Sequence, residues 1–115
     1  MRSSRCFITR PGLPDLVLPR LVRRAGTYRA AVRWCWRLRR PAGLALVDLA
    51  KDHGFVRQHL SDYLNRDDKP TRRDLPAWRV ATFEQVCGNT FITQWLAARQ
   101  RLTVLEELQA ERAAA

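Results

Sequence analysis

The sequence lacks any run of about eighteen apolar residues, and no apolar segment with a cleavage site lies near its start. We therefore expect neither a membrane-spanning helix nor a secretory signal. Cysteine is scarce as well: Cys6, Cys35 and Cys87 are odd in number, far apart and never arranged as CxxC. This spacing predicts neither a disulfide framework nor a zinc site. From these absences we expect a cytoplasmic protein with reduced thiols and no contact with membranes.

Patterns that support catalysis or ligand binding are also missing. His53 and His59 lie six positions apart across a glycine, which is not the single-face spacing that a metal pair needs on a helix. Cys87 has no histidine near it in the sequence to activate its thiol. Glycine-rich phosphate-binding patterns do not occur. We predict that the chain is not an enzyme and has no cofactor, no metal site and no small-molecule ligand.

Acidic residues are almost absent from the first 40 positions, which contain eleven arginines and only Asp15 as an acid. Residues 41–115 contain ten basic and ten acidic side chains, so the net charge of +10 comes from the first segment. Turn-forming residues predict that positions 1–26 are a flexible, irregular basic arm: Pro11, Gly12, Pro14 and Pro19. This arm either wraps duplex DNA, as minor-groove arms do, or is a disordered tail. Such a tail can even be upstream sequence included through a wrongly assigned start codon.

Two short helices separated by a glycine turn are predicted within residues 46–65. Helical spacing places three apolar residues of the first helix on one face: Leu46, Leu49 and Ala50. Gly54 supplies the left-handed turn that a residue with a Cβ resists. The second helix, residues 56–65, has its own inward set: Leu60, Tyr63 and Leu64. Polar side chains that can hydrogen-bond base edges remain on its outer face: Arg57, Gln58, Ser61 and Asp62.

Further helices are predicted on both sides of this pair. One begins after Thr27, a suitable cap, and ends before Pro41. Its arginines either meet phosphates or face solvent: Arg29, Arg33, Arg37 and Arg40. Its two tryptophans, Trp34 and Trp36, cannot both face the core, because residues two apart point about 200° apart around a helix. Another helix opens with Pro76 in its first turn and closes at Gly88.

The last predicted helix runs from about Phe91 to Glu111. In its second half, three leucines recur every three residues: Leu102, Leu105 and Leu108. They continue beyond the length of helix that is needed to cover a small core. An exposed apolar stripe on a protruding helix favours a partner, and a second copy of the chain is the simplest one. Residues 99–115 are therefore expected to form a homodimer; the alternative is a frayed tail that folds back on its own domain.

At the helix pair the chain resembles the lambda-repressor-like family of bacterial and phage regulators. The similarity rests on Ala50 in the first helix, Gly54 four residues later and Leu60 six residues beyond. It implies an all-α, compact five-helix domain over residues 27–98 that contains a helix-turn-helix. It also implies a transcriptional regulator, a repressor of phage or mobile-element type, that binds duplex DNA with helix 56–65 in the major groove. Val56 departs from the family, where a Ser or Thr cap is common.

The residues expected to bind DNA form two groups. Arg57 would read guanine, Gln58 adenine, Ser61 either base and Asp62 the amino group of cytosine. Backbone phosphates would be held by four basic residues: Lys51, Arg66, Arg72 and Arg73.

Other interpretations stay open. Arg57 to Asp62 can be only the solvated side of an amphipathic helix. The chain can also be a helical protein-interaction module, which the neutral charge of residues 41–115 favours. It can finally be a phage-encoded inhibitor that acts on a host polymerase or ribonucleoprotein, which the arginine-rich first segment favours.

Overall fold

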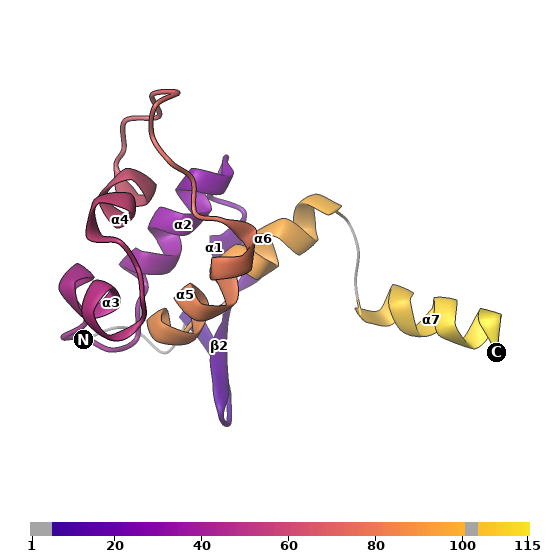
Figure 1. The fold of residues 1–115 in the computed structure, drawn as a ribbon. Helices are drawn as coiled ribbons and strands as arrows, with labels where there is room; N and C mark the ends of the chain where they lie inside the picture. Colours follow the sequence, from indigo (N-terminus) through magenta and orange to yellow (C-terminus); the bar gives the residue numbers. More distant parts are fainter. Residues whose placement is uncertain (1–5, 101–103) are drawn as a thin grey trace.

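The computed structural model describes residues 6–100 and 104–115. These residues form seven α-helices, a short 3-10 helix and a two-stranded antiparallel sheet (Figure 1). The elements in chain order are β1 (Phe7–Arg10), β2 (Leu13–Val17), α1 (Pro19–Val22), α2 (Tyr28–Arg37), α3 (Leu46–Asp52), α4 (Arg57–Leu64), η2 (Ala77–Arg79), α5 (Val80–Cys87), α6 (Phe91–Gln100) and α7 (Val104–Ala114). The prediction of an all-α, five-helix fold was therefore wrong, because the fold is mixed, although mostly helical.

The irregular arm expected over residues 1–26 was part of that error. Residues 7–17 form a hairpin in which Phe7 pairs with Val17, and Gly12 makes the turn with a φ of 71°. Val17 has no exposed surface and Val22 of α1 is only 3% exposed. Because burial of apolar side chains is the main favourable term in folding, this segment is a part of the core.

Backbone hydrogen bonds attach the hairpin to the turn between α5 and α6. The amide of Asp15 donates to the carbonyl of Gly88 at 2.9 Å, and the amide of Thr90 donates to the carbonyl of Asp15 at 3.0 Å. The side chain of Gln94 accepts from the amide of Val17 and donates to its carbonyl. Deleting residues 1–26 would therefore damage the fold, and is no test of a DNA-binding arm.

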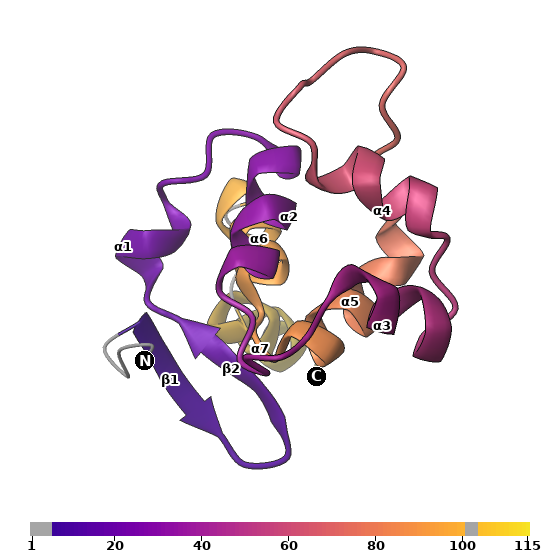
Figure 2. The same ribbon diagram turned by 90° about the vertical axis from the view of Figure 1, so that its left-hand side faces the viewer.

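Individual helices lie close to the predicted ones. The hydroxyl of Thr27 accepts a hydrogen bond from the amide of Ala30 at 3.1 Å and so caps α2, as predicted. Gly88 ends α5 in the left-handed region, with a φ of 78°. The side chain of Asn89 accepts from the amide of Phe91 at the start of α6. Figure 2 shows α3 and α4 on the opposite side of the body from the hairpin and α1.

The two tryptophans of α2 point to different neighbours, as their spacing predicts. Trp34 stacks on Phe91 of α6, with ring centroids 5.8 Å apart and an angle of 3° between the planes. Trp36 lies 6.4 Å from Phe83 of α5, whose other neighbour is Phe55, the residue after the α3–α4 turn. Both tryptophans are half-buried, so α2 is the element that joins the α5 and α6 sides of the core.

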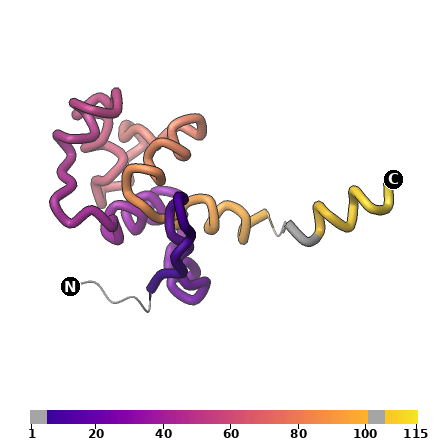
Figure 3. Tube along the Cα trace, turned by 90° about the horizontal axis from the view of Figure 1, so that it is seen from below, coloured from indigo at the N-terminus to yellow at the C-terminus, as the bar shows by residue number. Residues whose placement is uncertain are grey.

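The predicted last helix is described in two parts, α6 and α7. Figures 1 and 3 show α7 extending away from the body of the molecule. The side chains of residues 106–115 are all exposed, and Leu108 is 49% exposed. Of the other two leucines in the predicted stripe, Leu102 and the side chain of Leu105 lie outside the described residues.

Candidate nucleic-acid interface

The α3–α4 unit has the geometry that its sequence predicts. Gly54 turns the chain with a φ of 73°, and no atom other than the Arg79 side chain lies within 4 Å of where a Cβ would be. Leu49 of α3 and Leu60 of α4 are fully buried. Val56 precedes α4 without any side-chain hydrogen bond to the free amides of the helix start. The helix therefore begins at Arg57 and is held by packing, not by a polar cap.

The four predicted base readers of α4 fall into two groups. Arg57, Gln58 and Ser61 are exposed on its outer face. The Asp62 side chain is only 14% exposed, and its carboxylate pairs with Arg72 at 3.2 Å and with Arg73 at 3.3 Å. This geometry argues against base reading by Asp62, because its oxygens are already committed to two guanidinium groups.

The four predicted phosphate ligands divide in the same way. Lys51 and Arg66 are exposed. Arg72 is half-buried and also pairs with Asp67, at 3.5 Å. Arg73 is more open, with 56% of its side chain exposed beside its single ion pair. Arg72 is therefore the least accessible cation of this set.

The pKa of Asp62 reflects these contacts. Burial alone would raise the pKa of this carboxyl, but hydrogen bonds and charge from Arg72 and Arg73 outweigh the burial and bring the pKa below its ordinary 3.8. The charged form is thus the one that the fold stabilises.

Arg29 of α2 has a role that the sequence does not reveal. Its guanidinium group pairs with Asp68 at 2.9 Å and with Asp74 at 3.0 Å. It also donates to three backbone carbonyls at the end of α4 and in the loop that follows: those of Asp62, Asn65 and Arg73. Only 12% of the Arg29 side chain is exposed. We call this set of contacts the Arg29 clamp; it fixes the loop of residues 65–74 against α2.

The clamp also lowers the pKa of Asp68, chiefly through the hydrogen bond from Arg29. The only signal for it in the sequence is that an arginine-rich helix and an aspartate-rich loop occur in one chain. Local spacing does not show which of these charges meet.

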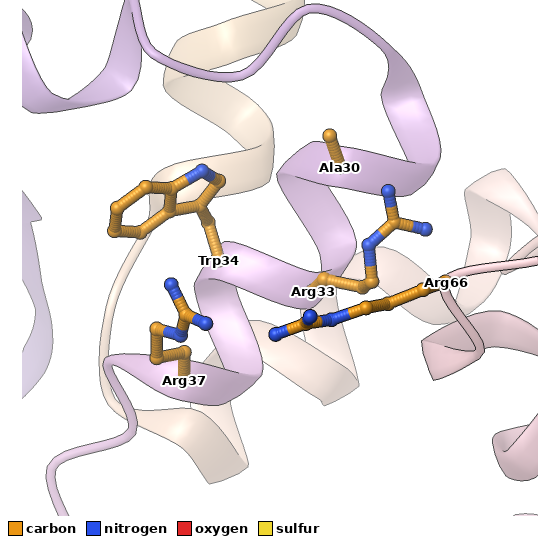
Figure 4. Close-up of a pocket in the computed structure, with 5 residues that line it drawn as sticks. All are labelled: Ala30, Arg33, Trp34, Arg37 and Arg66. Carbon is orange, nitrogen blue, oxygen red and sulfur yellow. The ribbon is translucent and has the colours of Figure 1, made fainter.

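A hollow lies between α2 and the segment after α4. It has a volume of about 150 Å³ and is lined by Ala30, Arg33, Trp34, Arg37 and Arg66 (Figure 4). In this view the Arg66 side chain reaches across α2 toward Arg37. None of the lining residues is acidic. We call this site the basic hollow.

A second surface feature lies beside the start of α4. Trp78 is 81% exposed and Val56 is 52% exposed, and both line a hollow of about 260 Å³ together with His59 and Arg79. The Arg79 guanidinium group lies 4.0 Å from the centre of the Phe55 ring and walls this hollow on one side. We call Val56 and Trp78 the apolar patch.

Metal ligands do not gather anywhere in the described part of the chain: no three His, Cys, Asp or Glu side chains are placed to share an ion. Cys35 and Cys87 are buried in the core, and burial raises the pKa of the Cys35 thiol. None of the described helices has the length and apolar content that crossing a membrane requires. Comparisons with models of protein families, with curated proteins and with solved structures found no match.

Proposed function

We propose that this chain is a sequence-specific DNA-binding protein, a transcriptional regulator that places α4 in the major groove. The observation that carries the proposal is the outer face of α4, where Arg57, Gln58 and Ser61 are exposed on a helix whose inner face is buried. These side chains supply the donors and acceptors that distinguish base pairs in the major groove. A helix anchored by buried residues such as Leu60 holds them in a fixed geometry.

The charges around α4 support the same proposal. Lys51 in the last turn of α3 and Arg66 after α4 are exposed cations on the two sides of α4 along the chain. The nearby aspartates are largely engaged with arginines of the same chain, as Asp62 and Asp68 are. Exposed cations whose neighbouring carboxylates are paired with other arginines attract phosphates.

Selection of bound duplexes from a random pool tests the proposal. The regulator should enrich a defined site, and the site of an Arg57→Ala variant should lose its preference at one position, because the guanine contact is gone. Recovery of a random set of sequences would contradict the proposal.

The resemblance to lambda-repressor-like regulators adds that the protein acts in the cytoplasm, as a phage or mobile-element repressor does.

The proposal includes a homodimer formed through α7. The described side chains of this helix, residues 106–115, are exposed. Leu108, the residue of the predicted stripe whose side chain the structure describes, is 49% exposed. A two-fold dimer would present two copies of α4 to successive turns of the major groove.

Analytical ultracentrifugation tests the dimer. The wild type should sediment as a dimer at micromolar concentration, and Leu108→Asp should sediment as a monomer, because burying an unpaired carboxylate is costly. Gln109→Asp, the same charge on the next position of α7, is the matched control and should stay dimeric. A monomeric wild type would remove the dimer.

Protein interaction is a second candidate function, and the apolar patch favours it. A tryptophan with 81% of its surface exposed beside an exposed valine is typical of a contact surface. The duplex selection separates the two candidates: an interaction module enriches no DNA site, whereas the regulator does. A Trp78→Ser variant that selects the same site as the wild type would show that the patch is not part of the DNA interface.

A further inference from the structure

The basic hollow brings together cations from two separate elements. Arg33 and Arg37 come from α2, and Arg66 comes from the segment after α4. Arg33 is partly neutralised, since it donates to the carbonyl of Asn65 and pairs with Asp68, which Arg29 also uses. Among the residues that the structure describes, no acidic side chain forms an ion pair with Arg66. Like charges that converge in one hollow repel one another, and a bound anion relieves that repulsion.

One wall of the hollow is rigid and apolar. The indole ring of Trp34 is stacked flat on Phe91, which is fully buried. The Arg37 guanidinium group lies 5.3 Å from the centre of the same indole ring. The volume of about 150 Å³ is roughly ten times the 10–15 Å³ that a single water requires. The hollow can therefore hold an anion with an apolar group attached, which a phosphodiester with its sugar is.

Arg66 links the hollow to α4, because it follows the last residue of that helix by two positions. The helix has eight residues, which at 1.5 Å per residue gives a length of about 12 Å. The major groove is about 12 Å wide. When Arg57 at the start of α4 contacts bases, the end of the helix and Arg66 reach the edge of the groove, where a backbone strand runs.

We infer that the basic hollow is a seat for one backbone phosphodiester of the bound duplex, with Arg37 and Arg66 as the cations and Trp34 as the wall against the sugar. The inference rests on the proposed function and adds a specific contact to it. The seat joins α2 to the DNA, so it sets how far α4 enters the groove.

Salt dependence of binding to an arbitrary duplex gives the first test. Arg66→Gln should reduce the slope of log affinity against log salt by about 0.9, the value for one phosphate contact. Arg66 is exposed, so the variant should keep the circular dichroism spectrum of the wild type. Arg20→Gln is the matched control, because it removes the same charge from an exposed residue of α1. Helix α1 lies on the opposite side of the body from α4 (Figure 2), so this variant should leave the slope unchanged.

A methylphosphonate scan of the duplex gives the second test, because it removes the charge of one phosphate at a time. A methylphosphonate at one position of the duplex should weaken wild-type binding by about tenfold, which is typical of a lost charged hydrogen bond. At that position the Arg66→Gln variant should show almost no further loss, whereas Arg20→Gln should show the full loss.

The outcomes separate the seat from the proposed function. If duplexes are bound with an enriched sequence but Arg66→Gln leaves the slope and the scan unchanged, the seat is overturned and the regulator stands. If binding is seen without sequence enrichment and the slope still falls, the seat stands and the sequence-specific function is overturned. Absence of any duplex binding at low salt overturns both.

Discussion

The two ends of α4 use their charged residues in opposite ways. At the N-terminal end, Arg57 and its neighbour Gln58 are exposed and face outward. At the C-terminal end, Asp62 is held by Arg72 and Arg73, and its carbonyl accepts from Arg29. The first end is free to meet a ligand, whereas the second is committed to the fold. The difference teaches that a charged residue in a promising pattern binds a ligand only if no other element of the chain brings it an opposite charge.

The arginines of α2 repeat this contrast within one helix. Arg29 and Arg37 lie eight residues apart, which is slightly more than two turns. Arg29 is almost covered and contacts two aspartates, whereas Arg37 is exposed and lines the basic hollow. Neither of the two roles expected for these residues, phosphate binding or plain solvation, describes Arg29.

The largest expected effect is the loss of the Arg29 clamp. Arg29→Leu removes the donor of Asp74 and of the Asp62 and Arg73 carbonyls, and leaves Asp68 and the Asn65 carbonyl with Arg33 alone. We therefore expect the free energy of unfolding to fall by about 3 kcal/mol. Urea unfolding followed by circular dichroism measures it. Arg20→Leu, at an exposed arginine of α1, is the control and should change stability by about 0.5 kcal/mol or less. Equal losses in the two variants would remove the contrast between them.

The next effect concerns the open end of α4. Arg57→Ala should weaken binding to the selected duplex by about 1 to 3 kcal/mol, because a bidentate guanine contact carries discrimination of that size. Binding to a random duplex should hardly change. Fluorescence anisotropy with both duplexes measures the two affinities, and Arg20→Ala serves as control. A loss of the same size on both duplexes would mean that Arg57 contacts only phosphate.

Substitution of Gly54, in the turn before α4, should lower stability through backbone strain alone. Gly54→Ala places a Cβ at a φ of 73° without a close neighbour, so we expect a cost of about 1 to 2 kcal/mol. Gly88→Ala meets the same strain and an overlap as well, because Cβ of Arg40 lies 3.0 Å from the new atom. Urea unfolding should therefore rank Gly88→Ala as the less stable variant; the reverse order would show that the α3–α4 turn is under a further constraint.

The smallest effect is expected at Asp62. Asp62→Asn should select the same DNA site as the wild type, because the carboxylate is engaged with arginines. Its folded-state pKa lies below 3.8, so its ion pairs stabilise the fold above that pH and lose their effect as the pH falls through the folded-state pKa. The stability difference between wild type and variant should therefore shrink on acidification. Asp52→Asn, at exposed Asp52, is the control. A changed base preference would restore Asp62 as a base reader.

Local signals were sufficient for α2 to α5 and for the turn at Gly54, but not for α1, which lies in the segment expected to be irregular. The cap at Thr27 and the left-handed end at Gly88 were predicted and are present, because each depends on a few neighbouring residues. The hairpin was missed, although Pro11 and Gly12 between two short apolar segments are a hairpin signal. Its strands are short, one contains Pro14, and its stability comes from contacts with residues more than seventy positions away, such as Gln94.

The sequence by itself determined where α2 to α6 run and which side of α4 is polar, because helical periodicity and glycine conformation are local properties. Only the tertiary structure decided which of the polar residues are open. Asp62, Arg72 and Arg29 meet because the loop after α4 folds back onto α2, whereas Arg66 and Arg37 line one hollow that has no acidic residue in its lining. Charge pairing depends on the distance between two groups in space, and the interaction energy weakens steeply as that distance grows by a few ångströms. This distance has no fixed relation to the separation of the two residues along the chain.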